Sequence, residues 1–144
     1  MLRRTLSVLT SLLILQYAHV ASAAEDSISL TFLGTGAPRP SLDRYGPSIL
    51  VEAGSQRLLV DAGPGMRERL FQAGGFELLT DINLILLTHL HFDHTISVPG
   101  LWLTGWLFGR KSPMTVYGPE GTSNMMNNDI FEKNKKNISE IREK

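Results

Sequence analysis

The 144-residue sequence predicts an α/β fold in which helices flank a mixed sheet. Three observations indicate this class. Short apolar runs bounded by glycine, proline and aspartate are typical of strands, and two of these runs are separated only by Gly54-Ser55, which favours a hairpin turn. Apolar residues at helical spacing follow a further buried run, so strands and helices alternate along the chain.

Each predicted element has its own sequence signal. We expect five strands, which cover residues 30–33, 47–53, 56–61, 82–87 and 114–117. A first helix should open around Pro64 and Gly65, because proline is favoured in the first turn of a helix. A second helix is expected within 95–108, where Val98, Leu101, Trp102 and Trp106 form one apolar stripe. The tryptophans are interpreted as core or as the wall of a pocket.

The segment THLHFDHT, residues 88–95, places three histidines and one aspartate within six positions. Imidazole and carboxylate groups suit Zn²⁺ and its first-row neighbours. On a helix, His89 and His91 would point apart, whereas an extended strand end puts them on one side and a turn brings Asp93 and His94 round. The sequence therefore predicts a metal site at the end of a strand. The alternative is a loop whose histidines are solvated or bonded to the backbone.

The order His89, His91, Asp93, His94 resembles the H-x-H-x-D-H signature of the metallo-β-lactamase superfamily. The resemblance implies that His89 and His91 hold one metal while Asp93 and His94 hold a second, most simply two Zn²⁺ ions, with Mn²⁺ or Fe²⁺ as alternatives. It also implies a metal-bound hydroxide as nucleophile. The segments LTFLGTGAPR and VYGPEGT resemble the ribonuclease Z and arylsulfatase-like branch.

Asp61 ends the third expected strand. The resemblance implies that its carboxylate orients a ligand histidine through the second ring nitrogen. By the same resemblance, Asp61 and Asp93 are the predicted catalytic residues. The alternative is that Asp61 caps the helix that follows. In the irregular loop between Pro38 and Pro47, Arg39 or Arg44 either meets an anionic group of the substrate or is solvated surface.

The chain begins with a basic segment and an apolar run, followed by Ala21-Ser22-Ala23, which predicts a secretory signal peptide over residues 1–23 and a secreted or periplasmic protein. An uncleaved anchor is the alternative. Cleavage would leave 12 basic and 14 acidic residues, a net charge of −2, with no basic stripe. This balance favours a small-molecule ester substrate over a nucleic acid, and we expect no membrane attachment after cleavage. The chain contains no cysteine, which removes thiolate ligands and nucleophiles from consideration.

The superfamily fold is an αββα sandwich of two sheets with helices outside. By resemblance, residues 28–126 form the first half of this α+β sandwich and residues 127–144 form a polar tail. The superfamily completes its two-metal site with later histidines and a bridging aspartate, whereas no histidine follows His94. We therefore expect an incomplete site, and strands with exposed apolar faces where the second sheet would pack.

The function predicted from these features is an exported metal-dependent hydrolase that acts on a phosphodiester, a sulfate ester or a carboxylic or lactone ester. Two alternatives remain. One is a non-catalytic remnant that binds a metal weakly. The other is a half-domain that pairs with a complementary chain or with copies of itself.

Overall fold

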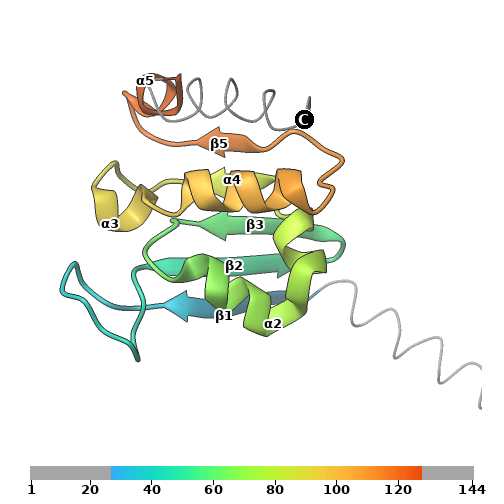
Figure 1. Cartoon of the computed structure of the whole chain (residues 1–144), viewed down its shortest axis with the longest axis horizontal. Coiled ribbons are helices and arrows are strands. Elements are labelled where there is room, and N and C mark those ends of the chain that lie inside the picture. The colour runs from blue at the N-terminus through green and yellow to red at the C-terminus, as the bar shows by residue number, and fades with distance from the viewer. Residues whose placement is uncertain (1–26, 128–144) are drawn as a thin grey trace, which may run out of the picture.

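The computed structural model describes residues 27–127, so the expected signal peptide (1–23) and all of the expected tail (127–144) except Asn127 lie outside it. Five strands form one sheet in the order β1-β2-β3-β4-β5 (Figure 1). Their bounds are β1 Ile28–Gly34, β2 Ser48–Ala53, β3 Gln56–Val60, β4 Leu84–Leu86 and β5 Thr115–Tyr117. The five predicted strands are therefore confirmed. Strand β1 extends beyond its predicted range at both ends, and the other four strands are one to three residues shorter than predicted.

The sheet is mixed, as predicted. Strands β1, β2 and β3 run antiparallel, with Leu30 opposite Val51, and Gly54 in the β2–β3 turn has a φ of 56°. Strands β4 and β5 are parallel to β3, with Leu59 opposite Ile85. Parallel neighbours need long crossover connections, and two helical segments provide them.

Helix α2 (Met66–Asp81) connects β3 to β4, and α4 (Val98–Leu107) lies between β4 and β5. Both helices cover the same face of the sheet (Figure 1). Helix α2 is kinked at Gly74 and Gly75, whose backbone angles are not helical. Two shorter helices, α3 (Phe92–Thr95) and α5 (Thr122–Asn127), complete the described elements.

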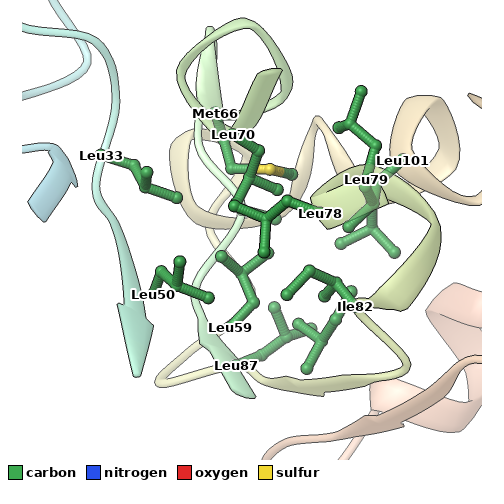
Figure 2. Close-up of a cluster of buried hydrophobic side chains, with 13 residues drawn as sticks. Leu33, Leu50, Leu59, Met66, Leu70, Leu78, Leu79, Ile82, Leu87 and Leu101 are labelled. Carbon is green, nitrogen blue, oxygen red and sulfur yellow. The ribbon is translucent and has the colours of Figure 1, made fainter. Parts of the chain in front are cut away.

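The hydrophobic core lies between the sheet and these two helices (Figure 2). The strands contribute Leu33, Leu50, Leu59 and Ile85, which point to the same face because side chains alternate along a strand. Its helical members are Met66, Leu70, Leu78, Leu79, Val98 and Leu101. These side chains are almost entirely removed from solvent, so they hold the sheet and helices together.

The opposite face of the sheet is apolar and exposed in the part of the chain that the structure describes. Leu30, Phe32, Leu86 and Tyr117 all remain accessible on it. The prediction of exposed apolar strand faces is therefore confirmed.

Two features of the helices differ from prediction. Helix α2 starts at Met66 and not around Pro64, because Gly65 takes a left-handed φ of 81° that ends the loop. The second expected helix is confirmed as α4, which lies within 95–108, but the turn expected at Asp93 and His94 forms the short helix α3. The backbone N–H of Ser97, between α3 and α4, bonds to the carbonyl of Ala62 and joins this segment to the β3 loop. Within residues 27–127, no helix is both long and apolar enough to cross a membrane.

Candidate metal centre

The predicted metal motif lies where the carboxyl ends of β3 and β4 meet. These strands are parallel, so the loops that follow them lie at the same edge of the sheet. Backbone hydrogen bonds join the loops: the N–H of Asp61 donates to the carbonyl of Leu86 at 2.8 Å, and the N–H of Ala62 donates to that of His94 at 2.7 Å. The strand order thus brings residues 25 and 32 positions apart in the sequence into contact.

Asp61 is at the centre of the contacts between these loops. Its Oδ1 accepts the backbone N–H of Thr88 at 2.8 Å, and its Oδ2 lies 2.8 Å from both the Thr88 hydroxyl and Nδ1 of His94. The Asp61 side chain is buried. The Asp61 backbone has a φ of 59°, which is unusual for a residue other than glycine. Such strain costs on the order of 1 kcal/mol and concentrates at functional sites.

The alternative role of Asp61 as a helix cap is wrong. The residue before α2 is Gly65, and no side chain caps the helix start. The carboxylate of Asp61 instead faces Thr88 and His94, because the backbone turns away from α2 at this position. Its contact with a second ring nitrogen has the geometry that the family resemblance implies.

The structure brings all four predicted metal ligands together. The ring centroid of His89 lies 4.7 Å from that of His91 and 3.9 Å from that of His94. Nε2 of His94 lies 3.6 Å from Oδ2 of Asp93. Asp93 is buried and His91 is exposed, so the cluster opens to solvent on one side.

The donor types in this cluster fit a first-row metal ion, but the ligand set is partial. Ligand atoms that share one zinc ion at about 2.0–2.2 Å from it lie roughly 3–3.5 Å apart, close to the separation of Asp93 and His94. No group of three or more histidine, aspartate or glutamate side chains within 27–127 is arranged to hold an ion. The described residues therefore supply fewer ligands than the three or four that zinc usually takes.

A cavity of about 490 Å³ adjoins the motif, because Phe92 of the motif is part of its wall. The loop before β2 supplies most of the remaining wall, including Arg39, Leu42 and Tyr45. Arg44 is engaged in this loop, where its Nη2 donates to the carbonyl of Thr35 at 3.1 Å. Among the described residues, Arg39 has no hydrogen-bond or ion-pair partner and is the cavity's available cation.

A second cavity of about 620 Å³ lies between α4, β5 and α5, and Trp102 lines it together with Met114 and Met126. This agrees with the interpretation of Trp102 as the wall of a pocket. The metal motif contributes no residue to this wall.

Sequence reasoning missed several residues that hold the site together. Thr88 was recognised only as the start of the motif. Hydroxyls of Ser48 and Ser97 also donate to the loop after β3, to the carbonyls of Asp61 at 2.8 Å and Gly63 at 2.7 Å. A Cβ on Gly63 would lie 2.6 Å from the carbonyl oxygen of Asp93, so only glycine allows this approach. Hydroxyl residues beside strand ends were the available signal.

The family described as Anti-Pycsar protein Apyc1 matches residues 28–140, which is most of the chain. The chain belongs to this family. It also has the metallo-β-lactamase fold and is similar to the ribonuclease Z branch of that superfamily, as the resemblance implied.

Three relatives illustrate the similarity. Ribonuclease Z of Bradyrhizobium diazoefficiens is 45% identical over 95 residues, which are 65% of this chain and 31% of the relative. The crystal structure of the short form of human tRNase Z is 33% identical with a TM-score of 0.60, covering 69% of this chain and 37% of that chain. The metallo-β-lactamase fold protein YhfI from Bacillus subtilis is 22% identical with a TM-score of 0.61, covering 70% and 42%.

The chain spans about a third of the length of the curated relatives that it matches. The matched part carries the first sheet and its helices. The similarity therefore shows the family and the fold of this part.

Proposed function

We propose that this chain contributes the first half of a metal-dependent phosphodiester hydrolase site. His89, His91, Asp93 and His94 are the proposed ligands, and Asp61 and Asp93 are the proposed catalytic carboxylates. The observation that carries the proposal is the buried Asp61 carboxylate, which contacts both Thr88 and His94 beside three clustered imidazoles. Metal-ligating histidines usually donate their second ring N–H to a carboxylate or another acceptor, and the contact of His94 with Asp61 has this form.

Each side chain has a role that its geometry supports. A bound zinc ion would lower the pKa of water and offset the charge of a phosphate. Asp61 holds the His94 ring with Nε2 directed toward Asp93, so the two ligand atoms converge. Asp93 is buried, and because its Oδ2 is the proposed ligand atom, we propose that its Oδ1 accepts a proton from water during hydrolysis.

Phosphodiesters are the favoured substrates among the esters considered. Relatives at 38–48% identity carry the name Ribonuclease Z, which supports phosphodiester cleavage, whereas nothing supports the sulfate or carboxylic ester. Arg39 in the cavity beside Phe92 would meet an anionic substrate. With equal numbers of basic and acidic residues, the chain has no net positive charge to favour nonspecific RNA binding. We therefore propose a small phosphodiester as substrate.

Activity requires ligands from outside residues 27–127, because the described residues do not assemble three ligands around one ion. We propose that they come from a further part of the polypeptide, from a second copy or from a complementary chain. The exposed apolar sheet face gives such a partner a surface to cover.

The test combines metal content, size and turnover on one sample. We expect close to two zinc ions per chain in an assembly that hydrolyses bis(p-nitrophenyl) phosphate, and loss of both properties in His91→Ala. Lys111→Ala, an exposed change outside the motif, is the matched control and should retain them.

One weakly held ion or none, without hydrolysis, would support the second candidate, a non-catalytic metal-binding remnant. The observation that favours this candidate is the absence of a three-ligand group within residues 27–127. Export remains a separate proposal that rests on the sequence of residues 1–23. It is tested by fractionating cells and sequencing the N-terminus of the recovered protein.

A further inference from the structure

Thr88 occupies an unusual position between a buried carboxylate and a proposed ligand. Its hydroxyl lies 2.8 Å from Oδ2 of Asp61 and 3.0 Å from Nδ1 of His89. Its backbone N–H donates to Oδ1 of the same carboxylate at 2.8 Å. Thr88 therefore contacts both oxygens of Asp61 and one imidazole at once.

Counting protons along this chain of contacts fixes the direction of each hydrogen bond. An ionised carboxylate only accepts, so the single proton of the Thr88 hydroxyl is donated to Oδ2 of Asp61. The hydroxyl oxygen then has only lone pairs to offer His89, and Nδ1 of His89 must carry the proton. The same argument applies directly to His94, whose Nδ1 donates to Oδ2 of Asp61.

The two rings consequently share one tautomer. With the proton on Nδ1, the lone pair of each ring is on Nε2, the atom left available to a metal ion. The ring centroids of His89 and His94 lie 3.9 Å apart, and the resemblance assigns these residues to different metal positions. One carboxylate thus orients a ligand of each proposed metal.

We propose that Thr88 is a positioning residue that transmits the orientation of Asp61 to His89 and makes His89 an Nε2 ligand. The effect of Thr88 on metal binding rests on the proposed function. The position of the proton on the His89 ring is a property of the metal-free chain and can be tested without it. His91 provides an internal comparison, because within residues 27–127 its ring nitrogens have no hydrogen-bond partner. Its tautomer should follow the intrinsic preference of histidine for a proton on Nε2.

The experiment measures ¹⁵N chemical shifts of the histidine rings in the metal-free chain, at a pH above the ordinary titration range of imidazole. In the unmodified chain we expect the proton on Nδ1 in His89 and His94 and on Nε2 in His91. In Thr88→Val, which keeps the branched shape but lacks the hydroxyl, His89 should change to the Nε2–H tautomer while His94 does not. Thr88→Ser should restore the original state of His89.

Thr80→Val is the matched control, because the Thr80 hydroxyl donates to the Glu77 carbonyl within α2 and does not contact the site. Zinc titration gives a second readout. We expect affinity about 10-fold or more lower in Thr88→Val, within the 10–100-fold range typical of lost partners of metal ligands, and little change in Thr88→Ser.

Three outcomes would overturn the proposal: an Nε2 proton on His89 in the unmodified chain, no change of His89 in Thr88→Val, or a joint change of His89 and His94. The joint change would mean that Thr88 only places Asp61. If Thr88→Val does not fold, the state of His89 in the unmodified chain and in Thr88→Ser still decides the matter. Absence of hydrolysis leaves the tautomer result unaffected, so failure of the proposed function is distinguishable.

Discussion

The two faces of the sheet have similar apolar residues in very different environments. Leu59, on the face covered by α2 and α4, has no exposed surface, whereas Phe32, on the opposite face, is 63% exposed. Hydrophobic side chains therefore form both faces, but only the covered face contributes its full burial to stability in the described part of the chain. The sequence shows which faces of the sheet are apolar, whereas the tertiary structure shows which of these faces is covered.

The metal motif combines buried and solvent-exposed side chains. Asp61 and Asp93 are buried by the loops of the covered half, while His91 faces solvent. The contacts that orient His89 and His94 are thus present within the described residues, whereas the ligand set there is incomplete. A preorganised partial site beside an open apolar face fits a unit that needs a partner to function.

Truncation of a covered side chain should have the largest effect. Leu59→Ala removes a fully buried side chain from the core, and we expect a loss of about 2–5 kcal/mol in the free energy of unfolding. Urea denaturation followed by circular dichroism measures it. A loss below about 1 kcal/mol would mean that the helical layer is not the main source of stability.

Removal of the Arg110 guanidinium should rank second. It donates to the Leu79 carbonyl at 2.9 Å, the Leu101 carbonyl at 3.3 Å and the Ile82 carbonyl, and so ties the end of α2 to α4. Burial lowers the pKa of Arg110, and the charge of Asp81 opposes this shift. Arg110→Met removes these donors from the Leu79, Ile82 and Leu101 carbonyls and should cost roughly 1–3 kcal/mol by urea denaturation.

Lys111→Met is the control for Arg110→Met, because it removes a neighbouring exposed cation. It should change the free energy of unfolding by less than about 0.5 kcal/mol. Equal effects of the two substitutions would show that general charge, and not the contacts with carbonyls, accounts for the role of Arg110.

The ion pairs at the rim of the covered face should contribute less. Arg57 contacts Glu52 at 3.1 Å and Asp81 at 2.8 Å, and all three side chains are at least a third exposed. Arg57→Met should cost less than about 1 kcal/mol, because solvent screens exposed pairs. The difference should shrink in 1 M NaCl, where the Debye length is about 3 Å. A salt-independent loss would indicate that packing of the Arg57 side chain matters more than its charge.

Substitution on the open face should have the smallest effect on stability. Phe32→Ser should change the free energy of unfolding of the monomer by no more than about 0.5 kcal/mol. It should at the same time reduce self-association in sedimentation velocity experiments, because an exposed apolar patch is removed. A loss as large as that of Leu59→Ala would show that the open face is packed in solution.

Much of the fold was predictable from local pattern. The β2–β3 hairpin was predicted from Gly54-Ser55, and β4 from an apolar run that ends in the motif, because turn residues and alternation are properties of neighbouring residues. The short helix α3 at the motif, and the break between it and α4, were not predictable. The break depends on bonds of Ser97 to Ala62 and Gly63, which lie more than thirty positions earlier.

By itself, the sequence determined the order of the elements, the position of the metal motif and the superfamily, because these depend on residue types at short, fixed spacing. Only the tertiary structure decided that Asp61 faces Thr88 and His94 and does not cap α2. Only the tertiary structure decided which sheet face is buried. The reason is that parallel pairing of β3 and β4 brings distant loops to one edge, and such long-range contacts leave no periodic signal in the chain.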